Sequence, residues 1–370
     1  MPFSFRGIVL NFVLRENEDL WSHLKSGEKP VVMYGTGNGA DKIISGFEQY
    51  GIRLADIFVS DEMYREGGEF HGHKLLRYAD IKNRYDDCII ILAFAVFRRD
   101  LLARIKNMSA EYELLAPSVS VFGSDFFSAD FLRKYEKEID EAYSLLEDDT
   151  SRKVFINSLE YRLSGKPEYL FECQTEREEV FRNIISLTDS ETFVDLGAYR
   201  GDTVEDFLIR TRGKYKKIYA LEPDKKNFQK LLENMGTLDN AEFINKASWS
   251  DSRILNFSGG GGRNSSLLDI DGKKYGDSGE IVHTAAVDGI LDGDGATFIK
   301  MDVEGAEAET LSGLSRTLHE FRPKLAVSAY HKIPDLVTLP LLIKQLNPDY
   351  RIFLRHHPYI PDWETNYYCV

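Results

Sequence analysis

The sequence has little cysteine, no long apolar run and no concentrated stretch of basic residues. Its three cysteines, Cys88, Cys173 and Cys369, are far apart and form no Cys-x-x-Cys pair, which argues against a zinc site or a disulfide scaffold and fits a reducing compartment. The longest apolar run, residues 88–97, is well short of the ~18 residues that suggest a membrane span. The N-terminus also lacks the apolar stretch of a signal peptide. We therefore expect a cytoplasmic protein without a membrane span.

Acidic residues outnumber basic ones, 60 against 46, and the formal net charge is −14. The basic residues are scattered, whereas nucleic-acid binding needs a concentrated positive face. We expect no nucleic-acid partner. With 370 residues and 43% hydrophobic content, the chain is long enough for two cores, because one domain takes roughly 100 to 200 residues.

Residues 1–125 have the pattern of a small Rossmann-like α/β domain. The apolar run Val31–Tyr34 ends in the glycine-rich segment 35–40 and is followed by a helical pattern, which predicts strand, turn and helix. A second strand is expected to end at Asp61, and the β-branched run Cys88–Ala93 predicts a third. The glycine segment with Asp61 loosely matches a dinucleotide pattern. Two interpretations stay open: a domain that binds nothing or serves as a platform, and one that binds a nucleotide or nucleotide sugar.

The rest of the chain divides into a helical connector, residues 126–190, and a second α/β domain, residues 191–370. Apolar residues recur at helical spacing over 129–147, and the connector is too apolar for disorder. After residue 190, strand and helix patterns alternate, with strands expected at residues 192–196 and 217–221 and helices at 307–321 and 335–346. This alternation predicts a parallel, doubly wound sheet. The glycine run 259–262 predicts either a flexible loop or a segment that closes over an acceptor.

The first motif is VDLGAYRGDT, residues 194–203. It places Asp195 at a strand end, with Gly197 and Gly201 in the turn before a helix. Glycine lets the backbone approach a ligand closely, and a carboxylate suits a cationic cofactor with an amino group better than it suits a pyrophosphate. The next strand ends in ALEPD, so Glu222 stands where doubly wound folds place a carboxylate for ribose hydroxyls.

The second motif is FIKMDVEGAE, residues 298–307. Lys300, Asp302 and Glu304 follow one another at a strand end, on the edge of the sheet where ligands bind in open α/β folds. Glu307 fits equally well as a favourable charge in the first turn of the next helix or as a member of the site.

These two motifs, with ALEPD and the AVDGIL segment around Asp288, resemble the FkbM family of methyltransferases over roughly residues 150 to 360. The resemblance implies a class I methyltransferase fold, S-adenosylmethionine as cofactor, and methylation of oxygen atoms in sugars or secondary metabolites. It places the methionine part of the cofactor near Asp195, its ribose at Glu222 and its adenine near Ala247 and Ser248. The full cofactor site expected is Asp195, Gly197, Ala198, Tyr199, Gly201, Asp202, Thr203, Glu222, Pro223, Ala247, Ser248 and Asp302.

Methyl transfer requires alignment of an acceptor hydroxyl with the methyl group and removal of a proton. His331 is the first candidate for the base, because an ordinary histidine pKa of ~6.5 lies near neutral pH. Asp302 is the competing base, and Glu304 and Lys300 are expected to position the acceptor. No metal is assigned, although Asp302 and Glu304 form part of a possible divalent-cation site.

The sequence thus predicts an S-adenosylmethionine-dependent methyltransferase that modifies a sugar hydroxyl in a glycan, polysaccharide or related precursor. Its expected partners are a small-molecule or glycan acceptor and a second copy in a homodimer. Methylation of a natural-product hydroxyl or a nitrogen is an alternative, because variable loops build acceptor pockets. The sequence is also compatible with a non-catalytic binding protein and with a nicotinamide-dependent oxidoreductase.

Overall fold

The computed structural model describes residues 10–119, 126–258, 266–268 and 280–370. The chain forms two compact units. The first comprises residues up to Tyr143, Asp149–Thr175 and His356–Glu364, and the second comprises Ser144–Asp148, Glu176–Arg355 and Thr365–Val370. The glycine run 259–262 lies outside the described residues.

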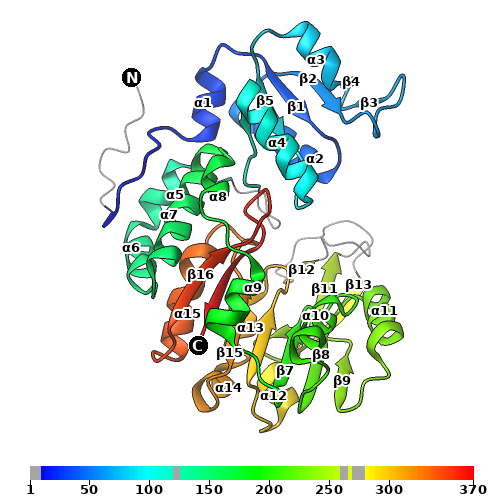
Figure 1. The fold of residues 1–370 in the computed structure, drawn as a ribbon, viewed down its shortest axis with the longest axis vertical. Coiled ribbons are helices and arrows are strands. Elements are labelled where there is room, and N and C mark those ends of the chain that lie inside the picture. The colour runs from blue at the N-terminus through cyan, green and yellow to red at the C-terminus, as the bar shows by residue number, and fades with distance from the viewer. Residues whose placement is uncertain (1–9, 120–125, 259–265, 269–279) are drawn as a thin grey trace. The chain divides into compact units, whose positions relative to one another are not determined.

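The first unit is built on a six-stranded sheet with the order β3-β4-β2-β1-β5-β6 (Figure 1). All its strand pairs are parallel except β3 with β4. The strands are β1 (Val31–Tyr34), β2 (Leu54–Val59), β3 (Glu69–Phe70), β4 (His73–Arg77), β5 (Ile89–Leu92) and β6 (Glu113–Leu115). The helices are α1 (Leu20–Ser26), α2 (Asn38–Tyr50), α3 (Tyr78–Arg84), α4 (Arg99–Glu111), α5 (Ala129–Lys134), α6 (Glu136–Ser144), α7 (Asp149–Ser164) and α8 (Glu168–Phe171).

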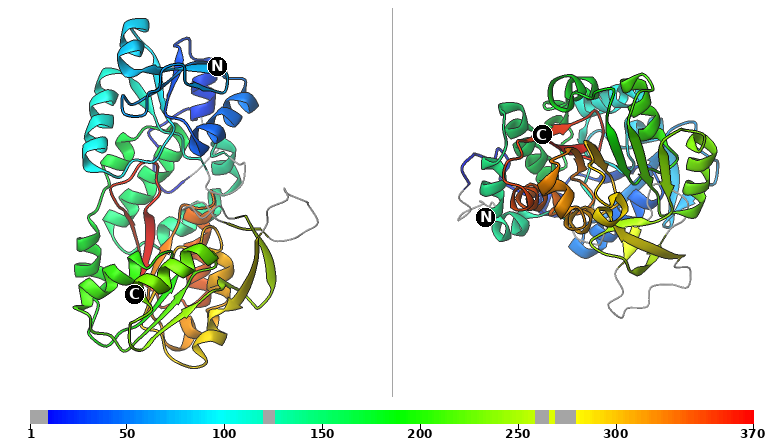
Figure 2. Two further views of the ribbon diagram at one scale, coloured as in Figure 1. Left: turned by 90° about the vertical axis from the view of Figure 1, so that its right-hand side faces the viewer. Right: turned by 90° about the horizontal axis from the view of Figure 1, so that it is seen from below.

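Both faces of this sheet are buried, as the continuous apolar strands require. Successive side chains of β1 point to opposite faces. Val31 and Met33 pack in one cluster with α1 and α2, whereas Val32 and Tyr34 pack in another with α4 and α7. The unit therefore has helices on both sides of its sheet, which Figure 2 shows from two further directions.

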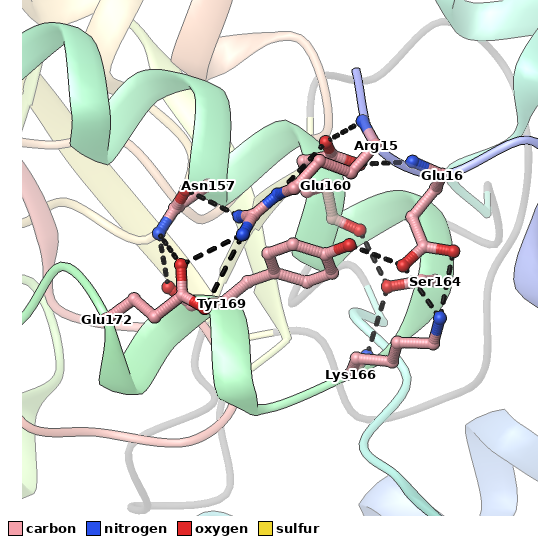
Figure 3. Close-up of polar contacts among 8 residues, drawn as sticks. All are labelled: Arg15, Glu16, Asn157, Glu160, Ser164, Lys166, Tyr169 and Glu172. Atoms are coloured by element: carbon pink, nitrogen blue, oxygen red, sulfur yellow. Dashed lines mark hydrogen bonds and ion pairs between the residues drawn. The ribbon is translucent and has the colours of Figure 1, made fainter.

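A polar network fixes residues 15 and 16 on the helices of the first unit (Figure 3). The buried carboxylate of Glu160 on α7 accepts hydrogen bonds from the backbone amides of Arg15 and Glu16. The Arg15 guanidinium lies 4.2 Å from the centre of the Tyr169 ring. Lys166 Nζ donates to Glu16 Oε1 at 2.7 Å. Backbone, charge and ring contacts together hold this segment against α7 and α8.

The second unit is built on a seven-stranded sheet with the order β16-β17-β15-β14-β7-β8-β9. The central pairs are parallel, and β17 runs antiparallel to β15. The strands are β7 (Thr192–Leu196), β8 (Lys217–Leu221), β9 (Ala241–Ile244), β14 (Phe298–Met301), β15 (Lys324–Ser328), β16 (Ile352–His356) and β17 (Thr365–Cys369). The helices are α9 (Arg177–Val180), the π-helix η1 (Phe181–Ile185), α10 (Asp202–Thr211), α11 (Lys225–Met235), α12 (Val287–Leu291), α13 (Glu307–Ser312), α14 (Ser315–Glu320) and α15 (Asp335–Leu346).

A smaller four-stranded sheet accompanies it, with the order β10-β13-β11-β12. Its strands are β10 (Ala247–Trp249), β11 (Ile254–Ser258), β12 (Ser266–Leu268) and β13 (Glu280–Ala286). The mixed α/β fold class predicted from the sequence, with parallel sheets, is confirmed. No helix in the described part of the chain is both long and apolar enough to cross a membrane.

Candidate active site

The site of the second unit lies where parallel strands end side by side. β7 lies between β8 and β14, and in register Lys300 is opposite Asp195. The carboxyl ends of such strands form one edge of the sheet, and ligands of open α/β folds bind there. The structure brings the segments after β7, β8, β14 and β15 to this edge.

The turn after β7 depends on glycine at two positions. Gly197 has φ +81°, and a Cβ atom there would lie 1.8 Å from the carbonyl oxygen of Asp302. Gly201 has φ +93°, and its Cβ would lie 2.7 Å from Cγ of Met235. The amides of Gly197 and Ala198 donate to the Leu221 carbonyl at 3.1 and 2.9 Å. The turn is thus packed between the ends of β8 and β14.

Glu222 ties the same turn to the end of β8. Its carboxylate accepts the amide of Tyr199 at 2.8 Å and the amide of Asp224 at 2.9 Å. Tyr199 has φ +47°, a conformation that non-glycine residues seldom adopt. Burial raises the pKa of Glu222 to about 7, although the two amides act in the opposite direction.

Asp195 is fully buried at the end of β7. Neither of its carboxylate oxygens receives a hydrogen bond from any residue that the structure describes. Burial raises its pKa to about 6, and the Lys300 ammonium, 3.4 Å from Oδ1, opposes this shift. Lys300 Nζ itself donates to the Gly197 carbonyl at 3.0 Å and lies 3.9 Å from Asp302 Oδ2. Burial opposes the charge of Lys300, but Asp195 and Asp302 outweigh it and raise its pKa.

His331, directly beyond β15, is surrounded by three carboxylates. Its Nδ1 lies 2.8 Å from Glu307 Oε1, while its Nε2 lies 3.3 Å from Asp302 Oδ1 and 3.6 Å from Glu304 Oε2. The imidazole is 2% exposed, whereas the side chains of Asp302 and Glu304 are 34% and 31% exposed. Asp302 and Glu304 are therefore the members of this cluster that face the open side of the site.

The charges in this cluster shift one another's pKa values. Burial disfavours the imidazolium of His331, but the three carboxylates outweigh it and raise its pKa to about 10. Burial raises the pKa of Glu304 to about 8. Burial also opposes ionisation of Asp302, yet Lys300 and His331 lower its pKa. A protonated His331 donates from both ring nitrogens and cannot accept another proton.

The remaining residues expected around the cofactor have more varied positions. Asp202 and Thr203 begin α10, and Pro223 follows Glu222. Ala247 and Ser248 belong to β10 and are buried. The Ser248 hydroxyl lies 2.9 Å from the Thr310 hydroxyl, so its hydrogen bonding is directed to α13. The Ser248 carbonyl oxygen also accepts from the Thr310 hydroxyl, at 3.1 Å.

Two residues with contacts at the site were not expected from the sequence. Tyr330 donates from its hydroxyl to Asp302 Oδ1 at 3.2 Å. The Asn245 side chain donates to the carbonyls of Glu222 and Pro223 at 2.8 and 3.0 Å. Asn245 directly follows β9, and Tyr330 lies two residues after β15. Their place at a strand end is the sequence feature from which a contact with the site could have been predicted.

The glycine segment of the first unit has a structural explanation. Gly35 has φ +109°, and a Cβ there would lie 2.5 Å from the Phe94 ring. A Cβ on Gly39 would lie 2.6 Å from the carbonyl oxygen of Ala93. Close packing thus accounts for these glycines, and nucleotide binding by this unit stays a prediction.

Comparison with known proteins gives the chain its family context. Residues 195–361 match the family described as "Methyltransferase FkbM domain". No curated protein has a detectably similar sequence. The crystal structure of methyltransferase FkbM from Methylobacillus flagellatus KT is similar, with a TM-score of 0.68 and 23% identity, covering 92% of this chain and 90% of that one. At this identity the likeness shows the fold.

Two smaller structures overlap about half of the chain. A SAM-dependent methyltransferase from Aquifex aeolicus has a TM-score of 0.31 and 12% identity, covering 55% of this chain and 97% of that one. The Aeropyrum pernix fibrillarin structure with natively bound S-adenosyl-L-methionine has a TM-score of 0.31 and 12% identity. The match covers 52% of this chain and 72% of that one. Likenesses this weak carry no argument about function.

Proposed function

Because residues 195–361 match the methyltransferase FkbM domain family, we propose that the protein transfers a methyl group from S-adenosylmethionine to an oxygen atom of a sugar or glycan precursor. The observation that carries the proposal is Asp195, a fully buried carboxylate that the Lys300 ammonium approaches only to 3.4 Å and whose oxygens accept no closer donor from the described residues. Burial of such a group is costly unless a partner supplies donors or charge. The amino group of a cationic cofactor supplies both.

The residues around Asp195 fit the rest of this cofactor. Gly197 and Gly201 leave two positions of the turn without a side chain, and Glu222 keeps lone pairs for ribose hydroxyls beyond its two amide partners. Lys300 balances Asp195 and fixes the turn through the Gly197 carbonyl. The proposed cofactor site comprises Asp195, Gly197, Ala198, Tyr199, Gly201, Asp202, Thr203, Glu222, Pro223, Ala247, Ser248 and Asp302.

When bound, S-adenosylmethionine supplies a methyl group made electrophilic by its sulfonium. The protein has to orient the acceptor and remove its proton. Asp302 and Glu304 are the partly exposed carboxylates at the site, whereas His331 is almost fully buried. We assign Asp302 to holding the acceptor hydroxyl and Glu304 to receiving its proton. His331 positions both carboxylates, and the Glu307 carboxylate positions His331.

A hydroxyl-rich acceptor suits these groups. Sugar hydroxyls donate hydrogen bonds to carboxylates and also to the hydroxyl oxygen of Tyr330, whose own proton is donated to Asp302.

The test is transfer of a radiolabelled methyl group from S-adenosylmethionine to a panel of monosaccharides, nucleotide sugars and amines. We expect label on a hydroxyl acceptor. Asp302→Asn is expected to lower kcat by about 100-fold or more, in the range of lost acid–base and positioning groups. Glu309→Gln, on the same helix as Glu307, is the matched control. Label on amines alone would contradict the proposed acceptor class.

A further inference from the structure

The cluster around His331 has the spacing of a metal site. Asp302, Glu307 and His331 each offer one potential ligand atom, and these atoms lie within 4.8 Å of one another. Two ligands of one ion with bonds of roughly 2.0 to 2.4 Å are separated by about 3 to 4.8 Å. The three side chains therefore already span the distance that one ion bridges.

Glu307 provides a second, independent observation. Its side chain is 1% exposed, and its Oε1 atom is close to His331 Nδ1 and accepts the Val303 amide at 3.2 Å. Its other oxygen, Oε2, is buried and has no hydrogen-bond partner within the described residues. Buried polar atoms are normally satisfied, and an anionic oxygen without a partner is costly. This carboxyl group, which faces His331, thus has unused capacity for a cation.

The charges around His331 also favour a bound cation. Three carboxylates, Asp302, Glu304 and Glu307, face the single imidazole of His331. Lys300 reaches only Asp302 among them, at 3.9 Å, and lies closer to Asp195. Carboxylates gathered at a buried site require compensating positive charge, and a divalent cation supplies more of it than one imidazolium.

We propose that Asp302, Glu307 and His331 bind one divalent cation, and that His331 releases a ring proton when the ion binds, because a metal-bound imidazole is neutral. Two carboxylates and one imidazole form a mixed oxygen and nitrogen set that suits Mn²⁺, whereas an all-oxygen set would suit Mg²⁺ or Ca²⁺. The partial exposure of Asp302 leaves coordination positions open toward the acceptor. From the sequence, the possible cation ligands were Asp302 and Glu304. The fold keeps Asp302 as a ligand and brings His331 and Glu307 next to it.

The role of this cation, unlike its binding, rests on the proposed function. A cation beside the acceptor lowers the pKa of the hydroxyl. The hydroxyl proton passes to Glu304, which is not one of the three ligands. The oxygen forms a bond to the methyl carbon while the carbon–sulfur bond breaks, and its electron pair stays on sulfur, giving S-adenosylhomocysteine and the methyl ether.

The binding test uses Mn²⁺ alone, without cofactor or acceptor, on the full chain. Free Mn²⁺ is measured by electron paramagnetic resonance during titration of metal-free protein. We expect one bound ion per chain. Asp302→Asn and Glu307→Gln are each expected to weaken binding by about ten-fold or more, whereas the control Glu309→Gln binds as the wild type. Circular dichroism checks that each variant is folded.

Absence of Mn²⁺ binding by the wild type would overturn the inference, and so would equal binding by Asp302→Asn and the wild type. If Glu307→Gln does not fold, Asp302→Asn with its partly exposed side chain still decides the result. A parallel titration with S-adenosylhomocysteine separates the two proposals. If the wild type binds S-adenosylhomocysteine but not Mn²⁺, the metal site is contradicted and the proposed cofactor is not. If it binds Mn²⁺ but not S-adenosylhomocysteine, the proposed cofactor is contradicted and the metal site is not.

Discussion

Gly197 marks the closest approach between the end of β7 and the segment after β14. A Cβ atom there would lie 1.8 Å from the Asp302 carbonyl oxygen, and the residue has φ +81°. We expect Gly197→Ala to lower the free energy of unfolding by about 3 kcal/mol, from overpacking and left-handed strain together. Urea unfolding followed by circular dichroism measures this change.

Gly213 is the matched control for that substitution. It has φ +71°, but a Cβ there would meet no atom within 4 Å. Gly213→Ala is expected to cost about 1 kcal/mol, the left-handed strain alone. Equal losses in the two variants would show that the close approach to Asp302 has no energetic consequence.

Asp195 predicts a dependence of stability on pH. Its folded pKa of about 6 exceeds the ordinary value of 3.8, so the folded state binds the proton more tightly than the unfolded state. The wild type therefore loses stability as pH rises from about 4 to about 6. Without ligand, Asp195→Asn is expected to be more stable than the wild type at pH 7, by at most about 3 kcal/mol, and similar at pH 4. Chemical denaturation at both pH values measures the difference, and lower stability of Asp195→Asn at pH 7 would contradict it.

The convergence of Asp195, Glu222 and Asp302 was predictable because each follows a strand, and the carboxyl ends of neighbouring parallel strands meet at one edge. Their roles in binding and catalysis stay predictions. The unused Glu307 oxygen and the engaged Ser248 hydroxyl were not predictable. Both depend on how α13 packs, and no local pattern encodes that packing.

At the scale of elements, α7 and α8 act as the anchor for the segment around Arg15. The carboxylate of Glu160 accepts the amides of Arg15 and Glu16 (Figure 3). Glu160→Ala is expected to lower the free energy of unfolding by about 2 kcal/mol, because two amides lose their acceptor, and to speed trypsin cleavage after Arg15 several-fold. Thermal unfolding and limited proteolysis measure these effects. Glu168→Ala, at an exposed position on α8, is the control, and equal cleavage rates in the two variants would show that the network does not hold the segment.

The bounds of a helix or strand were predicted well where one apolar pattern runs through the whole element. They were predicted poorly where tertiary contacts break the element into two. β7, β8 and α15 have the bounds expected from their apolar patterns. The single helix expected over residues 307–321 is instead α13 and α14. A Cβ on Gly313 would lie 2.0 Å from the Trp249 carbonyl oxygen, so the chain turns where it meets β10. The strand β17 was also missed, because its residues are buried on both faces and show no alternation.

At the scale of the whole molecule, the chain returns to its first unit near its end. Residues 356–364 belong to that unit, and Asp362 Oδ2 lies 2.5 Å from Arg162 Nε. Both side chains are buried, at 2% and 3% exposure. Asp362→Asn is expected to lower the free energy of unfolding by about 3 to 5 kcal/mol, because it leaves a buried guanidinium without its carboxylate.

Differential scanning calorimetry measures that loss, with Asp349→Asn as the control because the Asp349 side chain is 72% exposed. A fragment ending at residue 190 would lack Asp362, so we expect it to share the instability of Asp362→Asn. No sequence pattern indicated this long-range pair, because the two residues are separated by 200 positions. A stable Asp362→Asn protein would show that the returning segment is dispensable to the first unit.

The most direct measurement is calorimetric titration of the full chain with S-adenosylhomocysteine. We predict saturable binding of one ligand per chain, weakened about ten-fold or more by Asp195→Asn, since that change removes the negative charge facing the cofactor amino group. The control Glu309→Gln should bind as the wild type. Absence of binding by folded wild-type protein, or equal affinity in Asp195→Asn, would contradict the placement of the cofactor at the end of β7.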